Sequence, residues 1–143
     1  MRGSARFSTS EHGQSLVEIA LALPLMLALL LGLVDGARAF YVAGAIATAS
    51  REAANFAARN PSSTQAQVTQ RACDATAFVA FGSACPGLTV TCTADTEAVT
   101  VEVRYSFSLL TASVAEAAFK FNPIPISAAS RYPMLAAGAP CAT

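Results

Sequence analysis

The stretch that decides the fold is residues 13–34, GQSLVEIALALPLMLALLLGLV, in which Glu18 is the only charged side chain. Because about 20 apolar residues cross the hydrocarbon core of a bilayer as a helix, residues 16–34 predict a single transmembrane span. Its leucines each favour the membrane by about 0.5 kcal/mol, and together they outweigh one carboxylate at about 3 kcal/mol. Pro24 is tolerated here, because proline bends a membrane helix more often than it ends it.

The composition of the whole chain agrees with a membrane-attached protein of one domain. Its 143 residues are 54% hydrophobic and 13% charged, and the mean hydropathy is +0.48. Nine basic residues balance nine acidic ones, which argues against a nucleic-acid partner because such proteins carry a basic face. His12 is the single histidine, and no nucleophile or phosphate-loop motif occurs. We therefore expect no enzymatic activity, no cofactor and no metal site.

All four cysteines, Cys73, Cys85, Cys92 and Cys141, follow the span. An even number of cysteines in a small domain beyond a membrane segment indicates disulfides and an oxidising compartment. This places residues 36–143 outside the cytoplasm. Of the three possible pairings we favour Cys73–Cys85, which ties a helix to the next loop, together with Cys92–Cys141, which ties the C-terminal tail to the sheet.

The helical pattern continues well beyond the span. Residues 35–60 are rich in alanine and contain no proline, and Pro61 then ends the helix. A helix over residues 14–59 would be roughly 70 Å long, and the membrane would use less than half of it. The side chains expected on its buried face are Phe40, Ile46, Ala49, Ala53 and Phe56.

Two further features lie near the outer end of the span. Gly32, Gly36 and Gly44 have the spacing that lets two helices approach closely, although a helix rich in alanine and glycine also shows such spacing by chance. Asp35 and Arg38 are three residues apart and are expected to pair at the membrane edge.

Residues 61–143 predict a small disulfide-bonded α+β domain. A second helix over residues 62–81 would be capped by one of its first three side chains, Ser62, Ser63 or Thr64. Its apolar stripe consists of Val68, Ala72, Ala75 and Val79.

Strict alternation of apolar and polar residues predicts the sheet. Residues 88–93 and 99–109 form a hairpin, with one apolar face on each strand. Residues 111–122 are ambiguous between loop and one or two helical turns. A last strand over residues 124–132 closes a three-stranded antiparallel sheet, whose apolar face we expect the second helix or the end of the first to cover.

The start of the long helix carries a resemblance. The segment Gly13-Gln14-Ser15-Leu16-Val17-Glu18-Ile19-Ala20-Leu21, followed by the leucine-rich span, resembles the processing site of type IV pilin-like proteins. The longer stretch, residues 13–61, is similar to the TadE-like family, the minor pilins or pseudopilins of tight-adherence (Tad, Flp-type IVb) pilus and secretion machinery. Ile19 stands where the major Flp pilins have an aromatic residue, so the resemblance favours a minor pilin.

The resemblance implies a processing step and a structural role. A prepilin peptidase would cut after Gly13, so that residues 1–13 are a leader and the mature chain begins at Gln14. The new amine at Gln14 would meet Glu18 of a neighbouring subunit. Other pilins, the Tad inner-membrane assembly platform and the bacterial inner membrane are the implied partners. The domain would lie outside the cytoplasm, in the membrane pool or in an extracellular adhesion pilus.

Simpler interpretations remain open. Ala37-Arg38-Ala39 fits a signal-peptidase site, so cleavage before Phe40 would release a small secreted protein, and an uncleaved signal anchor is the other possibility. Glu18 could reach the headgroups of the bilayer without any partner, and Gly13 could be an ordinary loop glycine.

Overall fold

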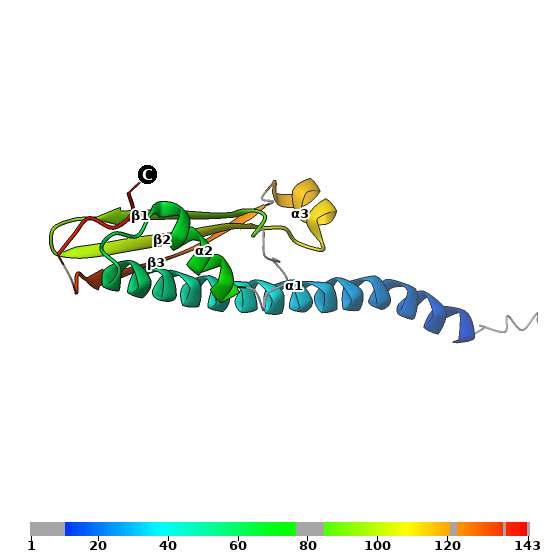
Figure 1. Ribbon diagram of the computed structural model, residues 1–143. Helices are drawn as coiled ribbons and strands as arrows, with labels where there is room; N and C mark the ends of the chain where they lie inside the picture. Colours follow the sequence, from blue (N-terminus) through cyan, green and yellow to red (C-terminus); the bar gives the residue numbers. More distant parts are fainter. Residues whose placement is uncertain (1–10, 77–84, 121–122, 136, 143) are drawn as a thin grey trace, which may run out of the picture.

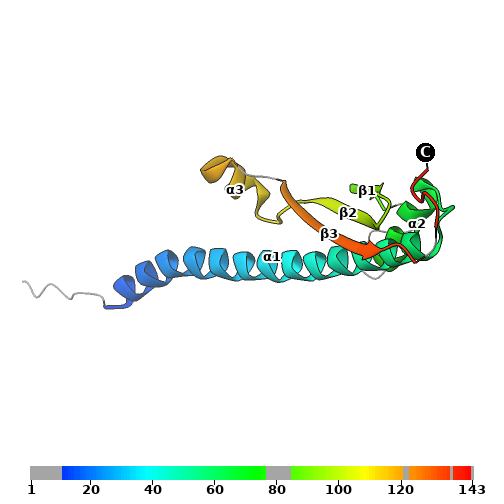
Figure 2. The same ribbon diagram turned by 90° about the vertical axis from the view of Figure 1, so that its left-hand side faces the viewer.

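One long helix extends along the molecule, and the sheet and the second helix pack against its C-terminal half. The computed structural model describes residues 11–76, 85–120, 123–135 and 137–142. The elements are α1 (Glu11–Arg59), α2 (Gln65–Thr76), β1 (Leu88–Ala94), β2 (Ala98–Phe107), α3 (Ala112–Phe119) and β3 (Ile124–Pro133). The N-terminal part of α1 projects alone, and the sheet and α2 lie beside its C-terminal half (Figure 1). A second view at right angles shows the same arrangement (Figure 2).

The helix α1 has 49 residues and continues without a break through Pro24. It begins at Glu11 rather than at the predicted Gln14, so the processing site expected after Gly13 lies in its first turn. Side chains of residues 13–34 are exposed on all sides of the helix. An apolar helix surface of this kind is typical of contact with lipid or with other helices.

From Asp35 onward α1 acquires a buried side. The buried residues on it are Asp35, Val42, Ile46, Ala49, Ser50, Ala53, Ala54, Ala57 and Ala58. The prediction for Phe40 was wrong, because its side chain is 83% exposed. The six-residue step from Phe40 to Ile46 turns the helix by roughly 600°, which leaves the two side chains about 120° apart. Val42, four residues before Ile46, takes the predicted place.

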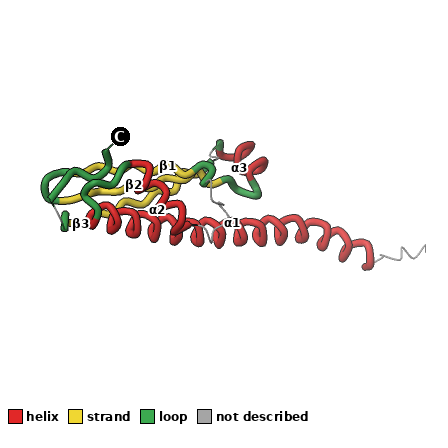
Figure 3. Tube along the Cα trace, in the orientation of Figure 1, coloured by secondary structure: helices red, strands yellow, loops and turns green. Residues whose placement is uncertain are grey.

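The three strands form one antiparallel sheet in the order β1-β2-β3, which confirms the predicted α+β layout. Figure 3 shows the strands as a layer beside the helices. Val99, Val101 and Val103 of the central strand β2 are fully buried, as the alternation predicted. The second half of α1 packs against β2 and β3, and α2 packs against β1, so both helices share in covering the sheet.

The ends of β2 differ slightly from the prediction. The strand begins at Ala98, where the Asp95 carboxylate accepts the Glu97 and Ala98 amides at 2.9 and 2.6 Å and so shapes the turn after β1. It ends at Phe107 rather than at residue 109, because the chain leaves the sheet there to approach α1. The ambiguous segment that follows contains the short helix α3.

The start of α2 is a reciprocal cap. The Thr64 hydroxyl accepts the Gln67 amide at 3.3 Å, and the Gln67 side chain accepts the Thr64 amide at 3.0 Å, so Thr64 is the cap among the three candidates. The neighbouring Gln65 side chain donates to the Val90 carbonyl at 2.7 Å and accepts the Cys92 amide at 3.2 Å. These bonds occupy the outer edge of β1. The predicted stripe residue Val79 and the predicted helix end near residue 81 lie outside the described residues.

Two disulfides tie the domain together. They join Cys73 to Cys85 and Cys92 to Cys141, which is the pairing favoured from the sequence. The Cys141 amide also donates to the Ser63 carbonyl at 2.8 Å, beside the start of α2. The C-terminal segment is therefore held both to the sheet and to the connection between α1 and α2.

The close packing of α1 on the sheet leads to a first prediction. Ala53 is fully buried, so Ala53→Leu should lower the free energy of unfolding by about 1–3 kcal/mol through overpacking. The matched control is Ala66→Leu on the exposed side of α2, which should change it by less than about 0.5 kcal/mol. Chemical denaturation in detergent micelles, followed by circular dichroism, measures both. Equal effects would contradict the packing described for α1.

Candidate functional site

The residues of the expected processing and charge-pairing site lie in the first two turns of α1. Gly13, Gln14 and Glu18 are all exposed, and in the part of the chain that the structure describes Glu18 has no ion-pair partner. Gln14 and Glu18 are four residues apart, so they lie on the same side of the helix one turn from each other. The first amides of a helix have no partner within it, so unwinding this turn to expose the Gly13 carbonyl would break few bonds.

The side chains of the span are exposed in the part of the chain that the structure describes. Leu16, Leu21, Leu29 and Leu33 are all between 68 and 74% exposed, and no segment of the described chain covers this part of α1. Its length and hydropathy fit a single-pass membrane anchor.

A second unpartnered surface continues past the end of the span. Gly36, Phe40 and Gly44 follow one another at intervals of four residues and so line one side of α1. Apart from the adjacent residues and the nearby backbone of α1 itself, no atom of the described chain lies within 4 Å of a Cβ built on either glycine, and the same holds for Gly32. Phe40 and the adjacent Tyr41 are 83% and 59% exposed. We call Gly36, Phe40, Tyr41 and Gly44 the outer stripe. Within one molecule these glycines have no packing partner, so helix packing there stays a prediction about a second chain.

Asp35 is the feature of this region that the sequence did not fully reveal. The Asp35–Arg38 pair is present as predicted, with 3.2 Å between Arg38 Nη1 and Asp35 Oδ1. The carboxylate is also buried and accepts three bonds from the segment after β2. The Leu110 amide, the Thr111 amide and the Thr111 hydroxyl donate to it at 2.9, 3.0 and 2.8 Å. Arg38 in turn lies over the Phe107 ring, 5.2 Å from its centroid.

These contacts form a clamp between α1 and the end of the sheet, at the first residue after the span. We call it the Asp35 clamp. Burial raises the pKa of the Asp35 carboxyl, but the hydrogen bonds from Leu110 and Thr111 and the charge of Arg38 lower it more. The pKa therefore lies below the ordinary value of 3.8, and the group is a carboxylate at neutral pH. Sequence spacing could reveal the Arg38 partner, because it is local, but not donors 75 residues away.

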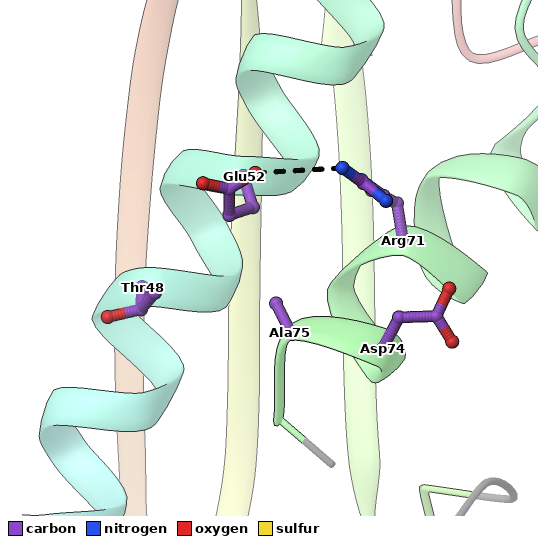
Figure 4. A pocket seen from close by; sticks show the side chains of 5 residues that line it. All are labelled: Thr48, Glu52, Arg71, Asp74 and Ala75. Atoms are coloured by element: carbon purple, nitrogen blue, oxygen red, sulfur yellow. Dashed lines mark ion pairs between the residues drawn. The ribbon is translucent and has the colours of Figure 1, made fainter. Parts of the chain in front are cut away.

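An open pocket of about 320 Å³ lies between α1 and α2 (Figure 4). Glu52 and Arg71 form an ion pair across it, 3.9 Å apart and half exposed, and Thr48, Asp74 and Ala75 complete its lining. A half-exposed pair at that distance contributes little to stability. In the described part of the chain, no group of three or more His, Cys, Asp or Glu side chains is placed to hold a metal ion.

The Asp35 clamp gives a second prediction. Asp35→Asn keeps the size of the side chain but removes its charge, and a hydrogen bond to a charged acceptor contributes about 1.5–3 kcal/mol. The Leu110 and Thr111 amides should then exchange with solvent at least about tenfold faster, measured by hydrogen exchange in micelles. Asp95→Asn, at the other carboxylate that accepts two backbone amides, is the control and should leave these two amides unchanged. Unchanged exchange in Asp35→Asn would contradict the clamp.

The clamp also predicts a pH dependence. Since the folded pKa of Asp35 lies below 3.8, its stabilisation is fully present above about pH 4 and is lost as the pH falls through the folded pKa. After correction for intrinsic exchange, protection of the Leu110 and Thr111 amides should hold from pH 7 to pH 5 and fall only below pH 3.8. Loss of protection already between pH 7 and pH 5 would show that another group controls this segment.

Comparison with known proteins gave a family match, and it lies within α1. Residues 13–55 match the sequence model of the family described as TadE-like protein, which confirms the resemblance drawn from the sequence. The match begins at Gly13, covers the span and the outer stripe, and includes 43 of the 143 residues. Searches among curated proteins and among solved structures gave no match.

Proposed function

We propose that this chain, with its TadE-like N-terminal helix, is a minor pilin or pseudopilin that takes part in assembling a Tad pilus or secretion apparatus. Residues 16–34 anchor it in the bacterial inner membrane, and the disulfide-bonded domain lies outside the cytoplasm. A prepilin peptidase cuts after Gly13 and leaves a mature chain that begins at Gln14. The role is structural and not catalytic. The observation that carries the proposal is the family match over residues 13–55, which includes the whole exposed apolar segment of α1, residues 13–34.

The exposure of the outer stripe supports an assembly role. Lipid can cover the apolar surface of residues 16–34, but Phe40 lies six residues beyond Val34 and past the charged Asp35. An aromatic side chain that is 83% exposed beside two bare glycines offers a close-contact surface to another helix. Other pilins of the same system are the proposed occupants.

The charge of Glu18 supports the same role. A lone carboxylate within an apolar helix is costly in lipid, and such residues usually pair with another charge. Processing after Gly13 would create an ammonium group at Gln14, one turn from Glu18 on the same side. In a bundle of parallel helices the Glu18 carboxylate of one subunit can accept the amine of the next, which would fix their axial register.

The alternative is a secreted protein produced by cleavage near Ala39. The structure gives a reason to disfavour it. Cleavage before Phe40 would cut α1 in its middle and remove Asp35, so the Leu110 and Thr111 amides would lose the acceptor that orders them. Cleavage after Gly13 leaves every contact of the domain intact.

Complementation in the native host tests the proposal. A strain that lacks the chain should lose surface pili or secretion, and the wild-type chain should restore it. Glu18→Ala should remain in the membrane fraction yet restore less than about a tenth of the assembly. Glu52→Ala, which removes an exposed carboxylate farther along the same helix, is the matched control and should restore it fully.

Intact mass of the recovered protein separates the remaining outcomes. A chain beginning at Gln14 agrees with pilin processing, and a start at Phe40 would overturn the proposal in favour of a secreted domain. Full assembly by Glu18→Ala would overturn the charge-pairing role.

A further inference from the structure

Leu110 is an exposed leucine held at the outer end of the membrane span. Its side chain is 61% exposed, whereas Phe107, three residues earlier, is buried. Its backbone amide donates to Asp35 Oδ1 at 2.9 Å. Asp35 directly follows Val34, the last residue of the apolar segment. The position of Leu110 along α1 is therefore fixed by a hydrogen bond to a known point of the helix.

The length of the span sets the height of that point above the membrane. Residues 16–34 rise by about 28 Å as a helix, close to the roughly 30 Å of the hydrocarbon core. Val34 then lies at the boundary of the core and Asp35 just beyond it. A leucine whose amide contacts the Asp35 carboxylate has its side chain within reach of the same boundary.

The surroundings of Leu110 suit the headgroup region. Figures 1 and 2 both show α3 beyond the end of the sheet, opposite the middle of α1. Its exposed residues include Glu116, and Lys120 follows directly, so this part of the domain carries both a negative and a positive charge. Arg38, which pairs with Asp35 on α1, has a side chain that is 44% exposed. Long basic side chains such as those of Arg38 and Lys120 can reach the lipid headgroups while an apolar side chain beside them contacts the acyl chains.

We propose that the Leu110 side chain inserts into the leaflet on the domain's side of the membrane. The domain would then contact the lipid surface directly, in addition to its covalent connection to the span through α1. The proposal depends on the membrane anchor of the proposed function but not on processing or pilus assembly. A bilayer is the occupant we assign, because the clamp fixes Leu110 at the lipid boundary whatever other proteins are present.

Leu135 provides a matched control within the chain. It is 64% exposed, almost the same as Leu110, but its amide donates to the Ala58 carbonyl at 3.2 Å. Ala58 lies 23 residues after Asp35 on α1, so Leu135 should stand roughly 35 Å farther from the membrane. Leu27, in the middle of the span, marks the hydrocarbon core.

The experiment uses the full chain in vesicles of phosphatidylcholine and phosphatidylglycerol. Leu110→Cys, Leu135→Cys and Leu27→Cys are each labelled with an environment-sensitive dye without reduction of the disulfides. Brominated lipids should quench the dye at positions 27 and 110 by at least twofold, and at position 135 by less than a tenth. Circular dichroism and intact disulfides establish that each labelled chain is folded.

The outcomes separate the two proposals. Quenching at position 27 without quenching at position 110 would overturn the lipid contact and leave the anchor standing. No quenching at position 27 would overturn both. If quenching at position 110 appears only when the protein is diluted in excess lipid, a neighbouring protein covers Leu110 at higher density and the lipid contact is wrong.

Discussion

The packing of α1 on the central strand is the interaction on which the rest of the structure depends. Fully buried alanines and Ile46 on one side of the helix meet the fully buried valines of β2. Small side chains let the helix backbone approach the sheet closely, and dense contact of this kind leaves no room for an added methylene. Because the helix is continuous, the same packing fixes the domain relative to the free apolar half of α1.

The Asp35 clamp marks the point where α1 changes its surroundings. Before it the helix offers an apolar surface on all sides, and after it one side belongs to the domain. A buried charge is stable only when it is paired and hydrogen-bonded, and Asp35 has both an arginine and three donors from the segment after β2. The clamp thereby holds the segment after β2 to α1, whereas the disulfides join α2 to the loop before β1 and β1 to the C-terminal segment.

Local patterns predicted most of the fold. Alternation located the strands, proline ended the long helix, and Thr64 stood among the proposed caps, because each depends on neighbours in sequence. The error at Phe40 arose because Phe40 and Ile46, six residues apart, were assigned to one face of the helix although such a step separates their side chains by about 120°. The donors to Asp35 could not be predicted, since they depend on where β2 ends in space. Gly13 and Glu18 were proposed from the family resemblance, and Gly32, Gly36 and Gly44 from their spacing. The roles proposed for them involve a second molecule, so the structure of one chain does not test them.

The one-sided position of the domain limits how several copies can stand together. In the span a neighbouring helix can approach α1 from any direction, whereas beyond Asp35 the sheet occupies one side and leaves the outer stripe free. When identical molecules stand at the same height, the domain of one collides with α1 of the next unless the uncovered sides of the two helices face each other. A bundle of such helices must therefore either splay apart outside the membrane or stagger its members along the axis, and a stagger is the arrangement that turns a cluster into a helical filament.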